Sequence, residues 1–404
     1  MATGRPHRVF VHVGLPKTGT TFLQDLMRQH RAALQSVGVC YPDDGHRDHF
    51  FAALDARGDH VFAGGVRPAA RDAWPRLVKL ALECEGTVVL GHEILATAPP
   101  DRARAALAAL EGVEVHVVAT ARDPARQVVA DWQESIKHGR RLRFAAYVGK
   151  AGLGGQDDSE SETGPVPFRG QQLAEVLDSW GGALPAERVH VVTVPPAGTQ
   201  PALLWHRFAD TIGIADPARF PPGDEVRANP SLGVADIEVM RRVSTFLDHR
   251  LVASEFGAVA KNLYAQRILV QVSRTPAPVP PADLMPTLEA LAERWIAAIT
   301  ERGYTVHGDL KELRPGAVAG RGPEDWDMEE ALDTATAATA ELLLEVARMR
   351  RKGAAAPRGV LRHRRLRAWR CAPGQPGCSD VADRRRSVRT PGVLVARHRR
   401  HRSG

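Results

Sequence analysis

The sequence predicts an α/β fold, a three-layer sandwich in which helices cover both faces of a parallel sheet. Short apolar runs alternate with helical patterns along the first half of the chain. The first apolar run leads into a glycine-containing loop and then into a helix, the order that a P-loop-like phosphate cradle requires. The chain has 404 residues, of which 44% are hydrophobic, enough for a large core.

The expected strands are four apolar runs, at residues 8–13, 87–90, 113–120 and 188–194. Parallel strands need crossover connections, and helical spacing of apolar residues places helices at 20–34, 70–84, 101–110 and 123–138. We therefore expect an α/β core in residues 1–235. Residues 236–352 are expected to form a mainly helical extension packed on or beside that core, ending in a long helix over residues 324–352.

Charge is distributed unevenly along the chain. Residues 348–404 contain 18 Arg and Lys residues and 2 Asp residues, whereas residues 1–347 hold the other 36 basic and 45 acidic residues. Residues 353–404 also lack apolar periodicity, so we expect an Arg-rich, disordered tail. An arginine-rich arm is able to bind nucleic acid, but Trp369 alone offers a large aromatic ring for stacking, which favours a neutral extension.

The cysteines and the apolar runs bear on the compartment. Cys40, Cys84, Cys371 and Cys378 show no C-x-x-C spacing, so we expect reduced, isolated thiols and neither a zinc site nor a disulfide framework. No apolar run is long enough to cross a membrane, and the short polar lead before the first strand has no room for a signal peptide. These features predict a cytoplasmic protein without a transmembrane segment.

The loop after the first strand carries the clearest chemical signal. It reads Gly14-Leu15-Pro16-Lys17-Thr18-Gly19-Thr20-Thr21. The two glycines allow tight turns, so that successive N–H groups can point at one anion, and the following helix adds its positive dipole end. The glycine spacing is that of a nucleoside-triphosphate P-loop, but Lys17 lies inside the loop and Thr20 occupies the place of the P-loop lysine.

A second strand ends in the charged turn Arg122-Asp123-Pro124. Pro124 suits the first turn of a helix. Because ligands of open α/β sheets bind outside the carboxyl ends of the strands, Arg122 is expected at the same edge as the loop, where its guanidinium can hold a phosphate. The alternative is that Arg122 only caps the helix or pairs with a neighbouring carboxylate.

The segment Pro16-Lys17-Thr18-Gly19-Thr20-Thr21 resembles the 5′-phosphosulfate loop of the sulfotransferase family, of bacterial type here. Arg122-Asp123-Pro124 is similar to the segment of that family that holds the 3′-phosphate of the donor. The resemblance implies transfer of a sulfuryl group from 3′-phosphoadenosine 5′-phosphosulfate to a hydroxyl or amine, without a metal and with Lys17 stabilising the bridging oxygen. The family usually has a Ser where this chain has Ala130.

The implied reaction needs a base, and the segment Gly91-His92-Glu93 offers two. The resemblance favours Glu93, because tyrosylprotein and carbohydrate sulfotransferases place a catalytic Glu in a comparable segment. His92 is the alternative, since enzymes that act on small phenols and steroids use a His. Because successive strand residues point to opposite faces, we expect only one of the two side chains to reach the cleft. Both residues could instead simply end the strand and cap the next helix.

The acceptor is expected to be a small molecule, lipid or carbohydrate, because the chain carries no separate module for a macromolecular substrate. Two other functions stay open. A P-loop kinase also needs a phosphate cradle, although the displaced lysine disfavours it. An inactive sulfotransferase-like binding protein would explain Ala130.

Overall fold

The structure is a computed structural model that describes residues 6–43, 48–62, 65–154, 168–200, 202–223, 231–316 and 320–355. The chain divides into two units, Met1–Arg350 and Arg351–Gly404. The predicted tail, residues 353–404, lies outside the described residues except for the end of the last helix.

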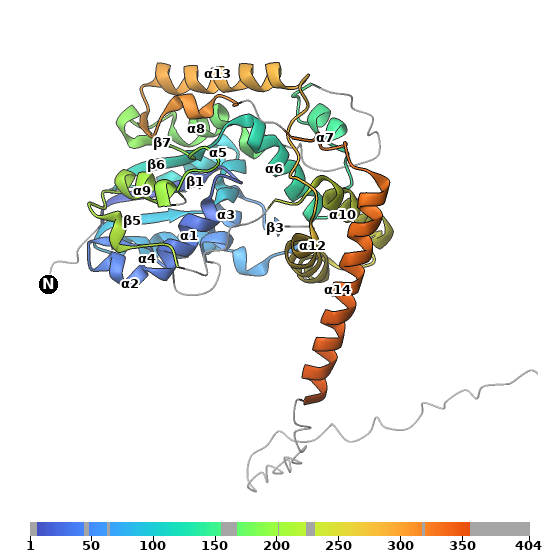
Figure 1. The fold of residues 1–404 in the computed structure, drawn as a ribbon. Helices are drawn as coiled ribbons and strands as arrows, with labels where there is room; N and C mark the ends of the chain where they lie inside the picture. The colour runs from blue at the N-terminus through green and yellow to red at the C-terminus, as the bar shows by residue number, and fades with distance from the viewer. Residues whose placement is uncertain are drawn as a thin grey trace, which may run out of the picture. The chain divides into compact units, whose positions relative to one another are not determined.

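The unit Met1–Arg350 is built on a six-stranded sheet with the order β2-β5-β1-β6-β7-β8, in which all pairs are parallel (Figure 1). The four expected strands are confirmed, and two short edge strands were missed because two or three residues show no pattern. The strands are β1 Pro6–Gly14, β2 Val39–Cys40, β5 Gly86–Gly91, β6 Glu114–Ala121, β7 Val189–Thr193 and β8 Thr305–His307, with a separate antiparallel pair, β3 Val61–Phe62 and β4 Gly65–Val66.

Helices cover both faces of the sheet, because successive strand residues are apolar on both sides. On one face Val9, Val11 and Val117 pack with α3, α4, α5, α6 and α8, and on the other Phe10 and Val118 pack with α1, α2 and α9. The expected three-layer α/β arrangement is therefore present. The helices are α1 Thr20–Gln29, α2 Arg31–Gln35, α3 Asp48–Arg57, α4 Ala73–Leu82, α5 Pro100–Ala108, α6 Pro124–Lys137, α7 Phe144–Lys150, α8 Leu173–Gly181 and α9 Ala202–Thr211.

The region after residue 235 is mainly helical, as expected, but it also supplies strand β8 and so completes the sheet. Its helix α13 contributes Leu288, Leu291 and Trp295 to the main core. None of the described helices is both long and apolar enough to cross a membrane. The helices of this region are α10 Val234–Leu247, α11 Ala253–Glu255, the π-helix η6 Phe256–Leu269, α12 Val270–Val272, α13 Met285–Arg302 and α14 Met328–Ala355.

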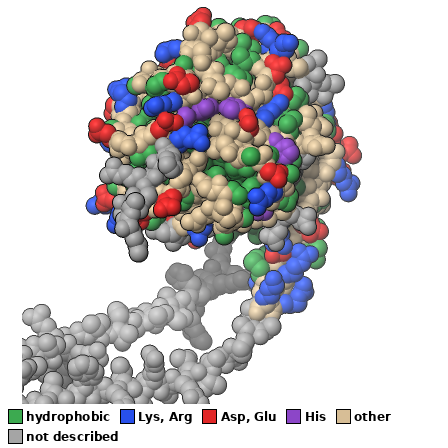
Figure 2. Space-filling model, turned by 90° about the vertical axis from the view of Figure 1, so that its left-hand side faces the viewer, with side chains coloured by type: hydrophobic (Ala, Val, Ile, Leu, Met, Phe, Trp, Pro, Cys, Tyr) green, Lys and Arg blue, Asp and Glu red, His purple; other side chains and the backbone are tan. Residues whose placement is uncertain are grey.

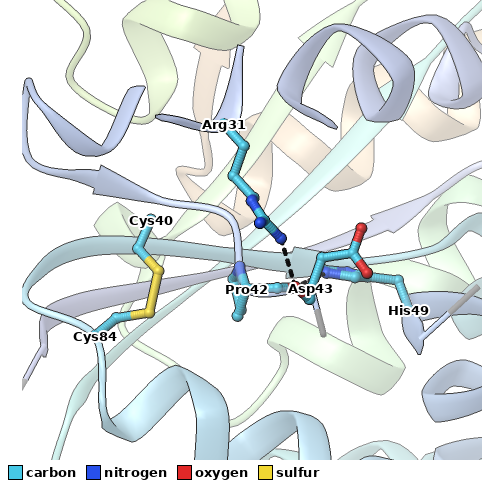
Figure 3. The surroundings of a disulfide bond; sticks show 6 residues. All are labelled: Arg31, Cys40, Pro42, Asp43, His49 and Cys84. Carbon is cyan, nitrogen blue, oxygen red and sulfur yellow. Dashed lines mark hydrogen bonds between the residues drawn. A yellow bond between two sulfur atoms is a disulfide. The ribbon is translucent and has the colours of Figure 1, made fainter. Parts of the chain in front are cut away.

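The expectation of four isolated thiols is wrong for two of them, since Cys40 and Cys84 form a disulfide (Figure 3). Cys40 ends β2, and Cys84 lies just before β5, the strand with which β2 pairs. The two cysteines are 44 positions apart in sequence, and only the sheet brings them together, with Cα atoms 6.3 Å apart. Local cysteine spacing therefore carries no signal for this bond.

The segment that follows β2 is tied to the end of β5 by a buried histidine. The Nε2 of His49 lies 2.6 Å from the Pro42 carbonyl oxygen, and the backbone N–H of Gly91 donates to Nδ1 of His49 at 3.2 Å (Figure 3 shows His49 and Pro42). Burial lowers the pKa of His49 to about 4. The imidazole is therefore neutral near pH 7, with Nε2 as its donor and Nδ1 as its acceptor.

Gly91→Ala is expected to destabilise the protein by about 3 kcal/mol or more. Gly91 has a φ of 150°, and a Cβ there would lie 2.0 Å from the backbone oxygen of His12 on β1, which cannot move away without breaking the sheet. Urea unfolding measures the loss. Gly303→Ala is the matched control, because its φ of 66° is also positive but open space surrounds it, so it should cost only about 1 kcal/mol.

Candidate functional site

The carboxyl ends of three neighbouring strands bring the predicted residues to one edge of the sheet. In the order of the sheet, β5 leads to His92 and Glu93, β1 to the loop at residues 15–19, and β6 to Arg122. The chain leaves β1 toward β2 and β5 on one side and returns to β6 on the other. This reversal places a topological switch point beside β1, where open parallel sheets bind their ligands.

The loop at residues 15–19 turns sharply between β1 and α1, with several residues in the left-handed region. Gly14, Lys17 and Gly19 have φ angles of 89°, 66° and 85°. Within the described part of the chain, the backbone N–H groups of Lys17 and Gly19 have no hydrogen-bond partner. Helix α1 begins at Thr20, directly after them. Unsatisfied N–H groups at a helix N-terminus attract negative charge.

Thr18, Thr20 and Thr21 differ in burial and in their hydrogen bonds. Thr18 is fully buried, and its hydroxyl donates to the Leu15 carbonyl at 2.5 Å and lies 2.6 Å from the Thr120 hydroxyl on β6. Thr20 is 3% exposed, and its hydroxyl donates to the Glu93 carboxylate. Thr21 is exposed at the start of α1. The side chain of Thr18 therefore holds the loop in shape and does not face a ligand.

Lys17 belongs to a network of ion pairs centred on Glu134. Its Nζ donates to Glu134 Oε2 at 2.5 Å, and Lys261 of η6 donates to Oε1 of the same carboxylate at 2.6 Å. Burial alone would raise the pKa of Glu134, but a hydrogen bond from His138 and the charges of the two lysines outweigh it and hold the pKa far below its ordinary value. Glu134 is thus a permanent anion that keeps Lys17 at the mouth of the loop.

Arg122 has no carboxylate partner in the described structure, so the alternative of an ion pair is not observed. Its Nε donates to Gln127 Oε1 at 3.2 Å and its Nη2 to the Arg126 carbonyl at 2.8 Å. Burial and the nearby Arg126 lower the pKa of Arg122 to about 10, against the opposing charge of Asp123. Asp123 is occupied, because it pairs with the Arg126 side chain and accepts from the Arg126 N–H at 2.9 Å as the N-cap of α6.

Gln127 joins the two predicted binding segments. Its Oε1 accepts from Arg122, while its Nε2 donates to the Pro16 carbonyl of the loop at 2.5 Å and to Gln171. Gln171 in turn donates to Asp131 Oδ1 at 2.9 Å. The position of the family's usual Ser is Ala130, and Ser135 is no substitute, since its hydroxyl donates to Trp132 of its own helix. The loop and Arg122 are therefore fixed to each other through one amide side chain.

His92 and Glu93 lie together, and the expectation that they point to opposite faces is wrong. Strand β5 ends at Gly91, His92 caps the short 3₁₀ helix Glu93–Thr97, and His92 Nδ1 lies 3.4 Å from Glu93 Oε2. Glu93 also accepts from Gln24 of α1 at 3.1 Å. A Cβ on Gly14 would lie 2.8 Å from the Glu93 Cα, so the start of the loop and Glu93 are in direct contact.

The protonation states of this pair follow from its surroundings. Burial alone would raise the pKa of Glu93, but His92 and the hydrogen bonds from Gln24 and Thr20 outweigh it and lower the pKa. Burial lowers the pKa of His92, although the Glu93 charge opposes the shift. Near pH 7 the Glu93 carboxylate is therefore ionised and the His92 imidazole is neutral. Each of the two side chains can accept a proton.

Sequence reasoning did not single out Gln127 and Asp131 on the polar face of α6. Gln127, Asp131 and Glu134 recur at spacings of four and three residues on a helix whose other residues are largely buried and apolar. That spacing is a readable signal for one polar helix face directed at a site. Gln171 and Lys261 have no such signal, because only the tertiary fold brings them to α6.

No protein-family model, no curated protein and no solved structure matches this chain. Within the described residues, no group of three or more His, Cys, Asp or Glu side chains is arranged to hold a metal ion.

Proposed function

We propose that this chain is a sulfotransferase that moves a sulfuryl group from 3′-phosphoadenosine 5′-phosphosulfate to a hydroxyl or amine acceptor. The observation that carries the proposal is the pair of anion-seeking groups at one sheet edge. The backbone N–H groups of Lys17 and Gly19 can bind one anion. Arg122, which has no carboxylate partner among the described residues, can bind another. A nucleotide with phosphates at both its 5′ and 3′ positions supplies both.

The chemistry of transfer assigns a role to each residue. The acceptor oxygen attacks sulfur, the bond from sulfur to the bridging phosphate oxygen breaks, and Glu93 takes the acceptor proton. Lys17 and the loop N–H groups stabilise the charge that grows on the leaving phosphate. Glu93 is favoured over His92 because its carboxylate lies against the start of α1, through Thr20 and Gln24.

The competing functions fit the geometry less well. A kinase of the P-loop type needs a lysine where Thr20 stands, and the Thr20 hydroxyl is committed to Glu93. An inactive binding protein would use the same nucleotide site without the base, yet Glu93 is ionised and close to the loop.

Calorimetry with adenosine 3′,5′-bisphosphate tests the proposal. We expect binding in the absence of magnesium, because the loop and Arg122 provide the cations. Magnesium-dependent binding of ATP together with no binding of the bisphosphate would favour the kinase. Binding of the bisphosphate without any turnover of 3′-phosphoadenosine 5′-phosphosulfate would favour the inactive protein.

The acceptor class and the compartment belong to the proposal as well. A small molecule, lipid or carbohydrate remains the proposed acceptor, and the cytoplasm remains the location predicted from sequence. The Cys40–Cys84 bond is unusual for a reducing compartment. Thiol labelling of these two cysteines in freshly lysed cells distinguishes a reduced from an oxidised setting.

A further inference from the structure

We propose that the acceptor carries an anionic group, a carboxylate, sulfate or phosphate, which binds Lys137 and Lys261 next to Lys17. This inference rests on the proposed sulfotransferase function and adds the chemical class of the acceptor.

The first observation is a surplus of positive charge around Glu134. Its two oxygens bind Lys17 and Lys261 at 2.5 and 2.6 Å, so a single carboxylate serves two ammonium groups. His138 Nε2 lies 2.7 Å from the Lys261 Nζ and 3.2 Å from Glu134 Oε1. Asp131, one turn earlier on α6, accepts from Tyr147 and from Gln171 at 2.9 Å, so its hydrogen bonds go to these two side chains and not to the lysines.

The second observation is Lys137, which is 4% exposed and has no hydrogen-bond or ion-pair partner within the described residues. Burial and the charges of Lys17 and Lys261 lower its pKa to about 8, and Glu134 opposes the shift. Lys17 and Lys261 bind the Glu134 carboxylate, and Lys137 interacts with it electrostatically without a hydrogen bond. A buried cation without a counter-ion is costly, and a bound anion removes that cost.

The position of Lys261 indicates that the anion belongs to the acceptor and not to the donor. Lys17 reaches Glu134 from the loop, whereas Lys261 reaches the other oxygen of the same carboxylate from η6. The loop cradle and Arg122 already account for both phosphates of the donor. An anion at Lys137 and Lys261 therefore belongs to the second substrate.

Matched acceptor pairs test this inference, with phenol against 4-hydroxybenzoate and glucose against glucuronate as probes. We expect the anionic member of at least one pair to be transferred with a KM at least about tenfold lower than its neutral partner, and Lys137→Met to remove that preference. Lys79→Met, on the exposed face of α4, is the control. Equal or better use of the neutral members, or no turnover of either anionic member, overturns the inference. Binding of adenosine 3′,5′-bisphosphate, measured in parallel, shows whether the proposed function itself has failed.

An independent feature lies near the amino ends of β6 and β7, where three histidines form a hydrogen-bonded row with a carboxylate at each end. The distances are 2.8 Å for Glu114 to His116, 2.9 Å for His116 to His190, 3.3 Å for His190 to His307 and 3.0 Å for His307 to Asp210. We call these five residues the histidine ladder. Figure 2 shows a row of histidine side chains on the surface, with basic and acidic side chains beside it.

Counting protons reveals the charge of the ladder. Each of its four links needs one proton, the carboxylates supply none, and three neutral imidazoles supply three. We infer that the ladder binds one additional proton and that this proton clasps the edge strand β8 to the sheet. His307 is the last residue of β8, which pairs only with β7.

The additional proton resides at either end of the ladder. Burial, followed by the charges of His116, His307 and Arg8, lowers the pKa of His190 to about 4, so the central imidazole is neutral. A proton on His116 satisfies all four links, and the imidazoles then donate to one another in the direction of His307. A proton on His307 also satisfies all four links, and the imidazoles then donate in the direction of His116. The other groups at the ladder are Arg188, 3.8 Å from Glu114, and Phe10, whose ring stacks on His116 and lies under Arg8.

The sign of the pH dependence follows. The clasp is complete while the ladder holds its additional proton, and one of the four links is lost when that proton leaves. The pKa of His190 has the opposite effect on stability. As the pH falls from 6.5 to about 4, His190 is protonated in the unfolded chain but stays neutral in the folded protein, so the free energy of unfolding decreases.

Glu114→Gln tests the count, since the amide of Gln donates a hydrogen bond and all four links are then satisfied by three neutral imidazoles. By ¹⁵N NMR of the ring nitrogens we expect four ring N–H protons among the three ladder histidines of the parent, and three in Glu114→Gln. Glu111→Gln, an exposed neighbour, should keep four. Three ring N–H protons in the parent, or four in Glu114→Gln, overturn the inference.

Discussion

Lys17→Ala is expected to abolish sulfuryl transfer and to leave the protein folded. The ammonium group is the side-chain cation held at the mouth of the loop, where charge grows on the leaving phosphate oxygen. Loss of one preorganised donor of this kind costs about a hundredfold to a thousandfold in kcat. A cationic leaving-group partner contributes at least the upper end of that range. Turnover of 3′-phosphoadenosine 5′-phosphosulfate, followed by release of the bisphosphate, measures the effect.

Two controls make the Lys17 experiment specific. Lys79→Ala removes an exposed lysine from α4 and should not change kcat. Near-ultraviolet circular dichroism of Lys17→Ala should match the parent, because Lys17 is half-buried and the loop is held by Thr18 and Gln127 instead. A variant that keeps turnover within tenfold of the parent would remove Lys17 from the mechanism.

The elements that could be predicted from sequence are those whose signal is local. The strand, loop and helix from β1 to α1 follow one another in the chain, and the N-cap at Asp123 and Pro124 is read from adjacent residues. The site parts that could not be predicted are tertiary. Lys261 reaches Glu134 across 127 residues, and β2 and β8 are too short for any periodicity.

The pair His92 and Glu93 shows a different limit. Their sequence context predicts a strand end at the correct edge of the sheet, which the structure contains. The direction of the two side chains depends on where β5 stops, and strand alternation ends one residue before His92. A difference of one residue in the boundary therefore changes two opposed side chains into a contacting pair.

Gln127 offers a physical reason why Ala130 is compatible with nucleotide binding. The family's usual Ser would place a hydroxyl on α6 beside Arg122. Here Gln127 fixes the Nε of Arg122 at 3.2 Å and at the same time holds the Pro16 carbonyl of the loop. Gln127 thus orients the guanidinium, and in the proposed nucleotide complex Arg122 itself would supply most of the recognition of the 3′-phosphate.

Arg122→Ala is therefore expected to reduce the affinity for adenosine 3′,5′-bisphosphate by about 2–5 kcal/mol, the cost of truncating one side of a buried charge pair. This corresponds to a loss of about 30-fold to several thousand-fold in Kd. Calorimetry with adenosine 5′-monophosphate serves as the internal control, because that nucleotide lacks the 3′-phosphate and should bind parent and variant equally. Arg104→Ala, on the exposed side of α5, should leave both affinities unchanged. An equal loss for both nucleotides would place Arg122 at the 5′-phosphate or in the fold of the loop, and unchanged bisphosphate binding would show that the 3′-phosphate is held by another residue.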